Sequence, residues 1–187
     1  MNAPEKWPPV YDFETLAGQI KELVSNYRIF DVFFQNDIVV NAPLCQGDIV
    51  HFKSPFPIID AEGDISTIDE EFSNWIIIGN TCDLTREIQD IEFSHLSPLI
   101  ELRQDEPESI LIGLKAYSSY KKFYIPSWNE KTHPGYFLDF THMCSTHKSC
   151  LFNANLVNLS ARMGRLSWLL FHSCIVRYLA RDDGRHE

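Results

Sequence analysis

The sequence predicts an α+β fold that is mainly β, a small barrel or strongly bent sheet with a helix before it and helices after it. Three observations predict it. Short runs rich in β-branched and aromatic residues fill residues 28–142, a helical spacing precedes them, and a helical pattern returns from Leu151 onward. Because 187 residues suffice for one good core, we expect a single domain over 1–187. It divides into a helical lead (1–27), a β core (28–150) and a helical tail (151–187).

The first expected element is a helix that begins after Asp12, a residue that can cap it, and ends near Asn26. Its apolar positions recur at helical spacing, at Leu16, Ile20, Leu23, Val24 and Tyr27. Short strands are expected next, in RIFDVFF (28–34), DIVVN (37–41) and GDIVHF (47–52).

Residues 54–74, SPFPIIDAEGDISTIDEEFSN, are rich in proline and acidic residues, which predicts a long loop or a lid. Turn signals such as Asp105-Glu106-Pro107 divide the apolar runs that follow. Further strands are expected in WIIIG (75–79), HLSPLIEL (95–102), ILIGLKA (110–116), KKFYIP (121–126) and GYFLDFTH (135–142).

The tail is expected to hold a short helical segment at 153–159 and a longer helix at 161–181. The apolar residues of the longer helix point nearly all round it, which is typical of a buried helix packed on the core or in an oligomer interface. Its arginines either form an edge that binds RNA or an acidic partner, or pair with acidic residues of their own chain, with loop 60–71 the first candidate. We favour the pairing. The arginines in question are Arg162, Arg165, Arg177, Arg181 and Arg185.

Charge and hydropathy narrow the range of partners. The formal net charge of -10 repels polyanions, so RNA is a disfavoured partner. The first ten residues contain no apolar run, and the most hydrophobic stretch, 166–180, is too short to span a bilayer and contains His172 and Arg177. We therefore expect a cytoplasmic protein without membrane contact. Its five cysteines are expected to be reduced thiols.

Three segments together resemble a known family. QGDIVHF (46–52), WIIIGNTCDL (75–84) and FSHLSPLI (93–100) look like the core of PemK/MazF-type toxins. The resemblance covers residues 45–142 and implies an SH3-like barrel that opens with the Gly-Asp-Ile-Val strand. The Cys-Asp pair and the helical tail resemble a divergent, uncharacterised branch of PemK-like proteins. Toxins of this family cut single-stranded RNA without a metal, using an arginine in or after the first loop and a nearby threonine or serine.

This chemistry carries over only in part. Thr81 matches the catalytic hydroxyl, but no lysine or arginine lies between Lys53 and Arg86, where the family's arginine belongs. Metal-free phosphodiester cleavage needs a cation or a dense array of donors at the phosphoryl oxygens. Arg86 is the remaining candidate for that cation. The interval instead holds seven carboxylates, at Asp60, Glu62, Asp64, Asp69, Glu70, Glu71 and Asp83.

Two functions therefore remain open. The first, which the acidic segment and the net charge favour, is a binding or accessory component of a bacterial toxin–antitoxin or phage-defence system. It would work with a protein encoded nearby or as a homo-oligomer. The alternative is a divergent metal-independent endoribonuclease toxin with Thr81, Arg86 and His95 in its site.

Cys82, Asp83 and His95 suggest a second kind of site. They could supply a thiol nucleophile, an orienting carboxylate and a base, since a thiolate needs a nearby imidazole to be populated at neutral pH. The simpler interpretation, which we favour, is that Cys82 fills a small apolar slot at a strand end and Asp83 caps the turn.

The run HMCSTHKSC places His142, Cys144, His147 and Cys150 within nine residues. These are zinc ligands by type, but zinc sites usually draw two ligand pairs from separated knuckles, and four ligands this close strain a tetrahedral geometry. We favour a strand end followed by a turn, in which His142 and Cys144 share one face of the strand. We expect no metal and no other cofactor.

Overall fold

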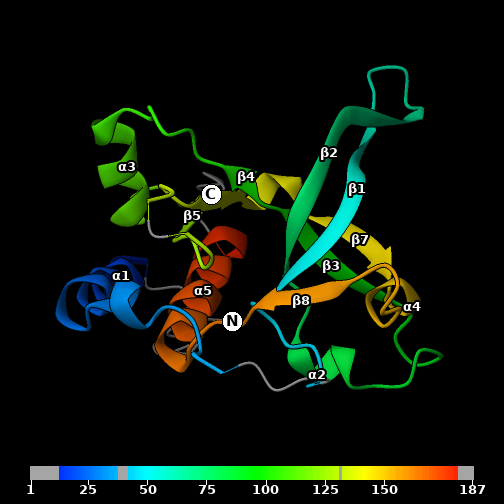
Figure 1. Cartoon of the computed structure of the whole chain (residues 1–187), viewed down its shortest axis with the longest axis horizontal. Helices are drawn as coiled ribbons and strands as arrows, with labels where there is room; N and C mark the ends of the chain where they lie inside the picture. The colour runs from blue at the N-terminus through cyan, green and yellow to red at the C-terminus, as the bar shows by residue number, and fades with distance from the viewer. Residues whose placement is uncertain (1–12, 38–41, 131, 181–187) are drawn as a thin grey trace, which may run out of the picture.

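The computed structural model describes residues 13–37, 42–130 and 132–180 (Figure 1). Helices α1, α3 and α5 gather on one side of the molecule, and the longest strands lie on the other. In chain order the elements, with η for a 3₁₀ helix, are α1 (Phe13–Asn26), η2 (Ile29–Val32), β1 (Ile49–Ile59), β2 (Ile65–Ile77), α2 (Thr81–Leu84), β3 (Phe93–Pro98), β4 (Ile100–Glu101), α3 (Glu108–Lys115), β5 (Lys122–Ile125), β6 (Tyr136–Asp139), η3 (Phe140–His142), β7 (Cys144–His147), α4 (Lys148–Leu151), β8 (Asn158–Ala161) and α5 (Arg165–Leu179).

The strands form two antiparallel sheets. One has five strands in the order β7-β3-β2-β1-β8, and the other has three in the order β4-β6-β5. Neither sheet closes into a barrel within the described ranges. Helix and strand each account for about 31% of the residues. The predicted α+β class is therefore confirmed, whereas the predicted dominance of strands is wrong.

The predicted lid at 54–74 is instead a long β-hairpin. Strands β1 and β2 pair from Ile49 opposite Ile76 to Ile59 opposite Ile65, and Figure 1 shows this hairpin projecting beyond the rest of the sheet. Side chains alternate between its two faces, with Phe56 buried and its sequence neighbours Pro55 and Pro57 exposed. The composition suggested a loop because prolines and acidic residues are typical of loops, but both are tolerated on the exposed side of an edge ribbon.

Three further expectations are wrong. ILIGLKA forms helix α3 instead of a strand, with Leu114 buried and Ile112 exposed, because a short apolar run fits either period. Residues 28–34 hold the short helix η2, and only Phe34 makes a bridge, to Met163. The segment predicted as helix at 153–159 leads into strand β8. Residues 38–41 of the expected strand DIVVN lie outside the described residues.

Other expectations are confirmed. Helix α1 ends at Asn26 as predicted, although Asp12, its expected cap, lies outside the described residues. The strand of GDIVHF is the start of β1, and strands occur within WIIIG, HLSPLIEL, KKFYIP and GYFLDFTH. The long tail helix is α5.

Helix α5 lies in the larger of two hydrophobic clusters. Leu170, Phe171 and Cys174 are fully buried there, while Trp168 and Leu169 are exposed on its outer side. The smaller cluster, centred on Trp75 and Leu96, fills the inner face of the β1–β2 hairpin. Along the described chain, every helix falls short of the length and apolar character needed to cross a membrane.

Candidate functional site

The candidate site is a cavity of about 300 Å³ where the turn before β1, helix α2 and the connection from β8 to α5 meet. The segments that form it are far apart in the sequence. The described residues that line it are Gln35, Cys45, Gln46, Asp48, Thr81, Arg162, Met163, Arg165 and Trp168.

Backbone hydrogen bonds join the turn at 45–48 to the end of β2. Gly47 N donates to Ile77 O at 2.8 Å, and Ile77 N donates to Asp48 O at 3.0 Å. Gly47 has a φ of +86°, and a Cβ at this position would lie 3.2 Å from the Met163 sulfur. Glycine is required here by both the backbone conformation and the close approach of the chain from the tail.

Gln46 connects this turn to helix α2 and α5. Its backbone N–H donates to Thr81 Oγ1 at 3.0 Å, and its side-chain amide donates to Ile78 O at 2.8 Å. The amide oxygen lies 3.2 Å from His172 Nδ1 on α5. Gln46 is buried, and these contacts satisfy its polar groups. Its backbone N–H holds the Thr81 hydroxyl in the pocket wall.

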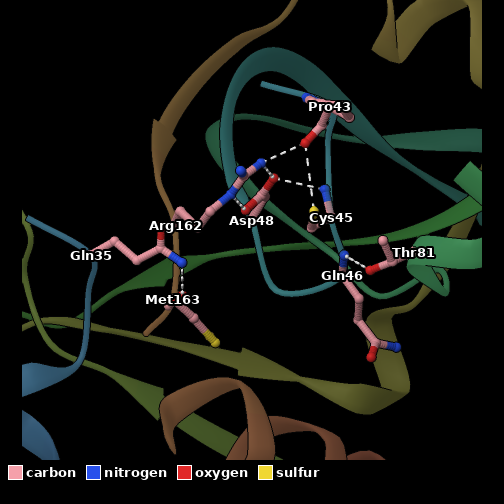
Figure 2. Close-up of polar contacts among 8 residues, drawn as sticks. All are labelled: Gln35, Pro43, Cys45, Gln46, Asp48, Thr81, Arg162 and Met163. Carbon is pink, nitrogen blue, oxygen red and sulfur yellow. Dashed lines mark hydrogen bonds and ion pairs between the residues drawn. The ribbon is translucent and has the colours of Figure 1, made fainter. Parts of the chain in front are cut away.

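An ion pair between Asp48 and Arg162 forms one wall of the pocket (Figure 2). Arg162 Nε donates to Asp48 Oδ1 at 2.8 Å and Arg162 Nη2 donates to Asp48 Oδ2 at 2.7 Å. The Asp48 side chain is 1% exposed and also accepts from Cys45 N at 2.8 Å, while Arg162 Nη2 donates to Pro43 O at 2.6 Å. This bidentate pair ties the tail to the start of β1.

Burial and this ion pair together affect the ionisation of Arg162 and Cys45. Hydrogen bonding to Asp48 raises the pKa of Arg162 above its usual value, so the guanidinium stays charged. Burial and the Asp48 charge raise the pKa of the Cys45 thiol, and Arg162 and a hydrogen bond with Thr81 oppose this only in part. At neutral pH Cys45 is therefore a protonated thiol and a poor nucleophile.

The rim of the pocket is more exposed than its wall. Arg165, the first residue of α5, is exposed, and the exposed Trp168 ring stacks on His172 with centroids 5.4 Å apart. Gln35 donates its side-chain amide to Met163 O at 3.2 Å. A guanidinium, an indole and amides around one cavity are suited to binding a planar polar or anionic group.

Of the five predicted site residues, only Thr81 lines this pocket within the described chain. Cys82 is exposed in α2, and Arg86 is exposed just after that helix. Lys148 Nζ donates to the backbone oxygens of Asp83 and Arg86 at 2.7 and 2.8 Å. His95 is exposed on β3, and its carbonyl accepts from the backbone N–H groups of Ile78 and Gly79.

The turn at 80–83 is capped by Asn80 and not by Asp83, the cap that we expected. Asn80 is the N-cap of α2, and its side-chain oxygen accepts from Cys82 N at 3.4 Å. Asp83 was expected to cap this turn, but it lies inside the helix. Asparagine before a helix is a strong cap signal that the sequence already contained.

The sequence reasoning missed Asp48 and the role of Arg162. Pairing of tail arginines with acidic residues of their own chain is confirmed for Arg162, but its partner is Asp48 and not the segment 60–71, and Arg177 donates to Tyr117 O and Ser119 O. Arg181 and Arg185 lie outside the described residues. No local signal marked Asp48, since an aspartate between a glycine and a strand is typical of an exposed turn; its burial, which requires a partner for the carboxylate, is seen only in the structure.

The His142–Cys150 run does not form a metal site in the structure. Across the described chain, no three His, Cys, Asp or Glu side chains are grouped to hold a metal ion. The His142 ring packs on Phe56 at 5.4 Å, and Cys144 is half-buried, with a pKa raised by burial. His147 Nδ1 accepts from Ser149 N and caps α4. The predicted strand end and turn are wrong in detail: His142 ends the 3₁₀ helix η3, so it does not share a strand face with Cys144, and β7 runs directly into α4.

The chain matches no protein-family model, no curated protein and no solved structure. Function is therefore inferred from the chemistry of the pocket, which combines an ion pair, an exposed guanidinium and an exposed indole.

Proposed function

We propose that this chain is a cytoplasmic, PemK/MazF-like protein that acts as a binding or accessory component of a bacterial toxin–antitoxin or phage-defence system. In this proposal the five-stranded sheet is a modified form of the family's SH3-like barrel. The pocket at Asp48 and Arg162 is its binding site, and it works with a partner protein or as a homo-oligomer.

One observation carries the proposal. Two of the three segments that resemble that family, QGDIVHF and WIIIGNTCDL, meet at the pocket. Gln46 and Asp48 come from the first and Thr81 from the second, and hydrogen bonds join the segments directly. The residues of these two family-like segments thus line one cavity.

The ionisation of the pocket favours binding over catalysis. The Arg162 charge is already neutralised by Asp48, and the Cys45 thiol is protonated at neutral pH. None of the described residues that line the cavity is a histidine. General acid–base cleavage of a phosphodiester needs a group that can give and take a proton near neutral pH, which this wall does not supply.

A second function is retained because of a specific observation. Arg162 and Thr81 are far apart in the sequence but line the same cavity, and Arg165 stands at its rim. This arrangement brings a cation near the hydroxyl, although no basic residue lies between Lys53 and Arg86. It supports the alternative of a metal-independent endoribonuclease that cuts single-stranded RNA.

Induced expression in bacteria distinguishes the two functions. The chain would be expressed alone and with its genomic neighbour, and total RNA from the same cultures would be examined for cleavage. The accessory role predicts normal growth and intact RNA when the chain is alone. The variants Thr81→Ala and Arg165→Ala alter the pocket, and Arg86→Ala is the matched arginine control outside it.

Growth arrest with cleaved RNA would overturn the accessory role. If Thr81→Ala and Arg165→Ala relieved the arrest while Arg86→Ala did not, the nuclease would be assigned to this pocket. Relief by Arg86→Ala alone would assign the activity to the segment after α2 instead.

A further inference from the structure

A second binding surface lies beside β2, on the side away from β1. Strand β3 pairs with β2 only at Trp75, Ile76 and Ile77, and the chain then turns away as Leu99 N donates to Asn74 O at 2.9 Å. Among the described strands, none pairs with this side of β2 from Ile65 to Ser73. An unpaired strand edge is a template for an added strand.

The two edges of the hairpin are not equivalent. On β1 the outer segment contains Pro55 and Pro57, which lack a backbone N–H and therefore interrupt pairing. On β2 the segment 65–73 contains no proline, and it has a bulge at Asp69–Glu70, where the register with β1 shifts. The β2 edge therefore keeps its backbone N–H groups on both sides of the bulge, whereas the prolines remove two from β1.

A cavity of about 440 Å³, here called the β2 groove, lies along this edge. It is lined by β2 residues from Glu70 to Asn74 and, across from them, by Leu99, Ile100, Glu101 and Tyr136. The edge and the groove together offer backbone hydrogen bonds and a place for side chains, which are the two requirements of strand addition.

The β2 groove is negatively charged. It contains three glutamates, of which Glu71 pairs with the exposed Lys53 at 2.6 Å and Glu101 lies 2.7 Å from His133. Glu70 is exposed on the strand edge. Burial is the main cause that raises the pKa of Tyr136, and the charges of Glu101 and Glu130 add to it.

We propose that the β2 groove binds an extended, basic segment of a partner protein, which adds to β2 as a strand in line with β3. Backbone hydrogen bonds within 65–73, on either side of the bulge at Asp69–Glu70, supply the attachment, and lysine or arginine side chains meet Glu70 and Glu101. The inference rests on the proposed accessory role for its setting and adds the chemistry of the partner. Its surface is separate from the pocket, since the two cavities share no lining residue among those described.

The test uses the full chain and a synthetic peptide of alternating lysine and valine, about nine residues long to match segment 65–73. Its control is the same peptide N-methylated at every residue, which keeps the charge and removes the N–H donors. Calorimetry at physiological salt should show the unmethylated peptide binding at least about tenfold more tightly. Hydrogen exchange should show slower exchange within 65–73.

Three variants complete the test. Glu70→Lys should weaken binding of the unmethylated peptide about tenfold, whereas Glu87→Lys, an exposed glutamate outside the groove, should leave it unchanged. Thr81→Ala should also leave binding of the unmethylated peptide unchanged. The groove proposal can therefore fail independently of the proposed function of the pocket. Equal affinity for both peptides would overturn the proposal. Dimerisation of the chain that Glu70→Lys abolishes would assign the groove to a second copy and would also overturn it.

Discussion

Individual residues of the WIIIGNTCDL segment are constrained mainly by packing. Gly79 lies two residues after the end of β2 at Ile77, and a Cβ built on it would lie 2.1 Å from Ser94 Oγ on the neighbouring strand β3. Ser94 Oγ is buried and has no hydrogen-bond partner among the described residues. The glycine thus leaves room for the serine hydroxyl, which itself contributes little to stability.

We predict that Gly79→Ala lowers the free energy of unfolding by about 1–3 kcal/mol, because the added methyl overpacks against Ser94. Ser94→Ala alone should have a small effect, since the hydroxyl it removes is unpartnered. In the double variant the nearest remaining contacts of the new Cβ are 3.3 Å or longer, so most of the lost stability should return. Urea denaturation of the four proteins gives the coupling, and additive effects would contradict this account.

At the scale of secondary-structure elements, Lys148 is the main link between α2 and α4. It is fully buried, and its ammonium donates to the carbonyls of Asp83 and Arg86, while its backbone N–H donates to Glu92 O. The Lys148 side chain therefore binds the chain at two points just after Thr81, at Asp83 and at Arg86. A buried lysine between carbonyls satisfies acceptors that a short helix leaves unpaired at its C-terminus.

We predict that Lys148→Met costs about 2 kcal/mol, because the aliphatic stem is kept while two charge-assisted hydrogen bonds are lost. The loss should be local, with faster hydrogen exchange within residues 81–87 and smaller changes elsewhere. The matched control is Lys21→Met on the exposed side of α1. Unchanged exchange in 81–87 would show that other contacts hold this segment.

Across the whole molecule, the outer part of the β1–β2 hairpin buries little. Ile59 and Ile65 are 75% and 86% exposed, whereas Trp75, in the lower part of the same hairpin, is 2% exposed. The stability of the fold therefore depends on the part of the hairpin that lies against the two hydrophobic clusters.

We predict that replacing residues 59–65 by Asn-Gly changes the free energy of unfolding by no more than about 1 kcal/mol, since a two-residue turn can join the shortened strands. In contrast, Trp75→Ala should cost about 3–5 kcal/mol through the cavity it leaves. Both are measured by urea denaturation. A large loss on shortening the hairpin would mean that its tip contacts more of the protein than the structure indicates.

The sequence alone determined the elements whose pattern is local. Helix α1 and helix α5 follow from helical spacing, and the strands of GDIVHF and WIIIG follow from runs of β-branched residues ended by turn signals. It also indicated Thr81, through a resemblance to a family rather than through geometry. The helices and strands can be predicted because their patterns depend on residues only a few positions apart, and these can be read directly from the sequence.

Only the tertiary structure decided the rest. Whether 54–74 is a lid or a hairpin depends on pairing between β1 and β2, and whether ILIGLKA is a strand or a helix depends on what Leu114 packs against. The partner of Arg162 is 114 positions away, at Asp48, and nothing in the local pattern of either residue specifies the other. Long-range pairing is selected by burial and charge in three dimensions, so the pocket emerges only when the chain is folded.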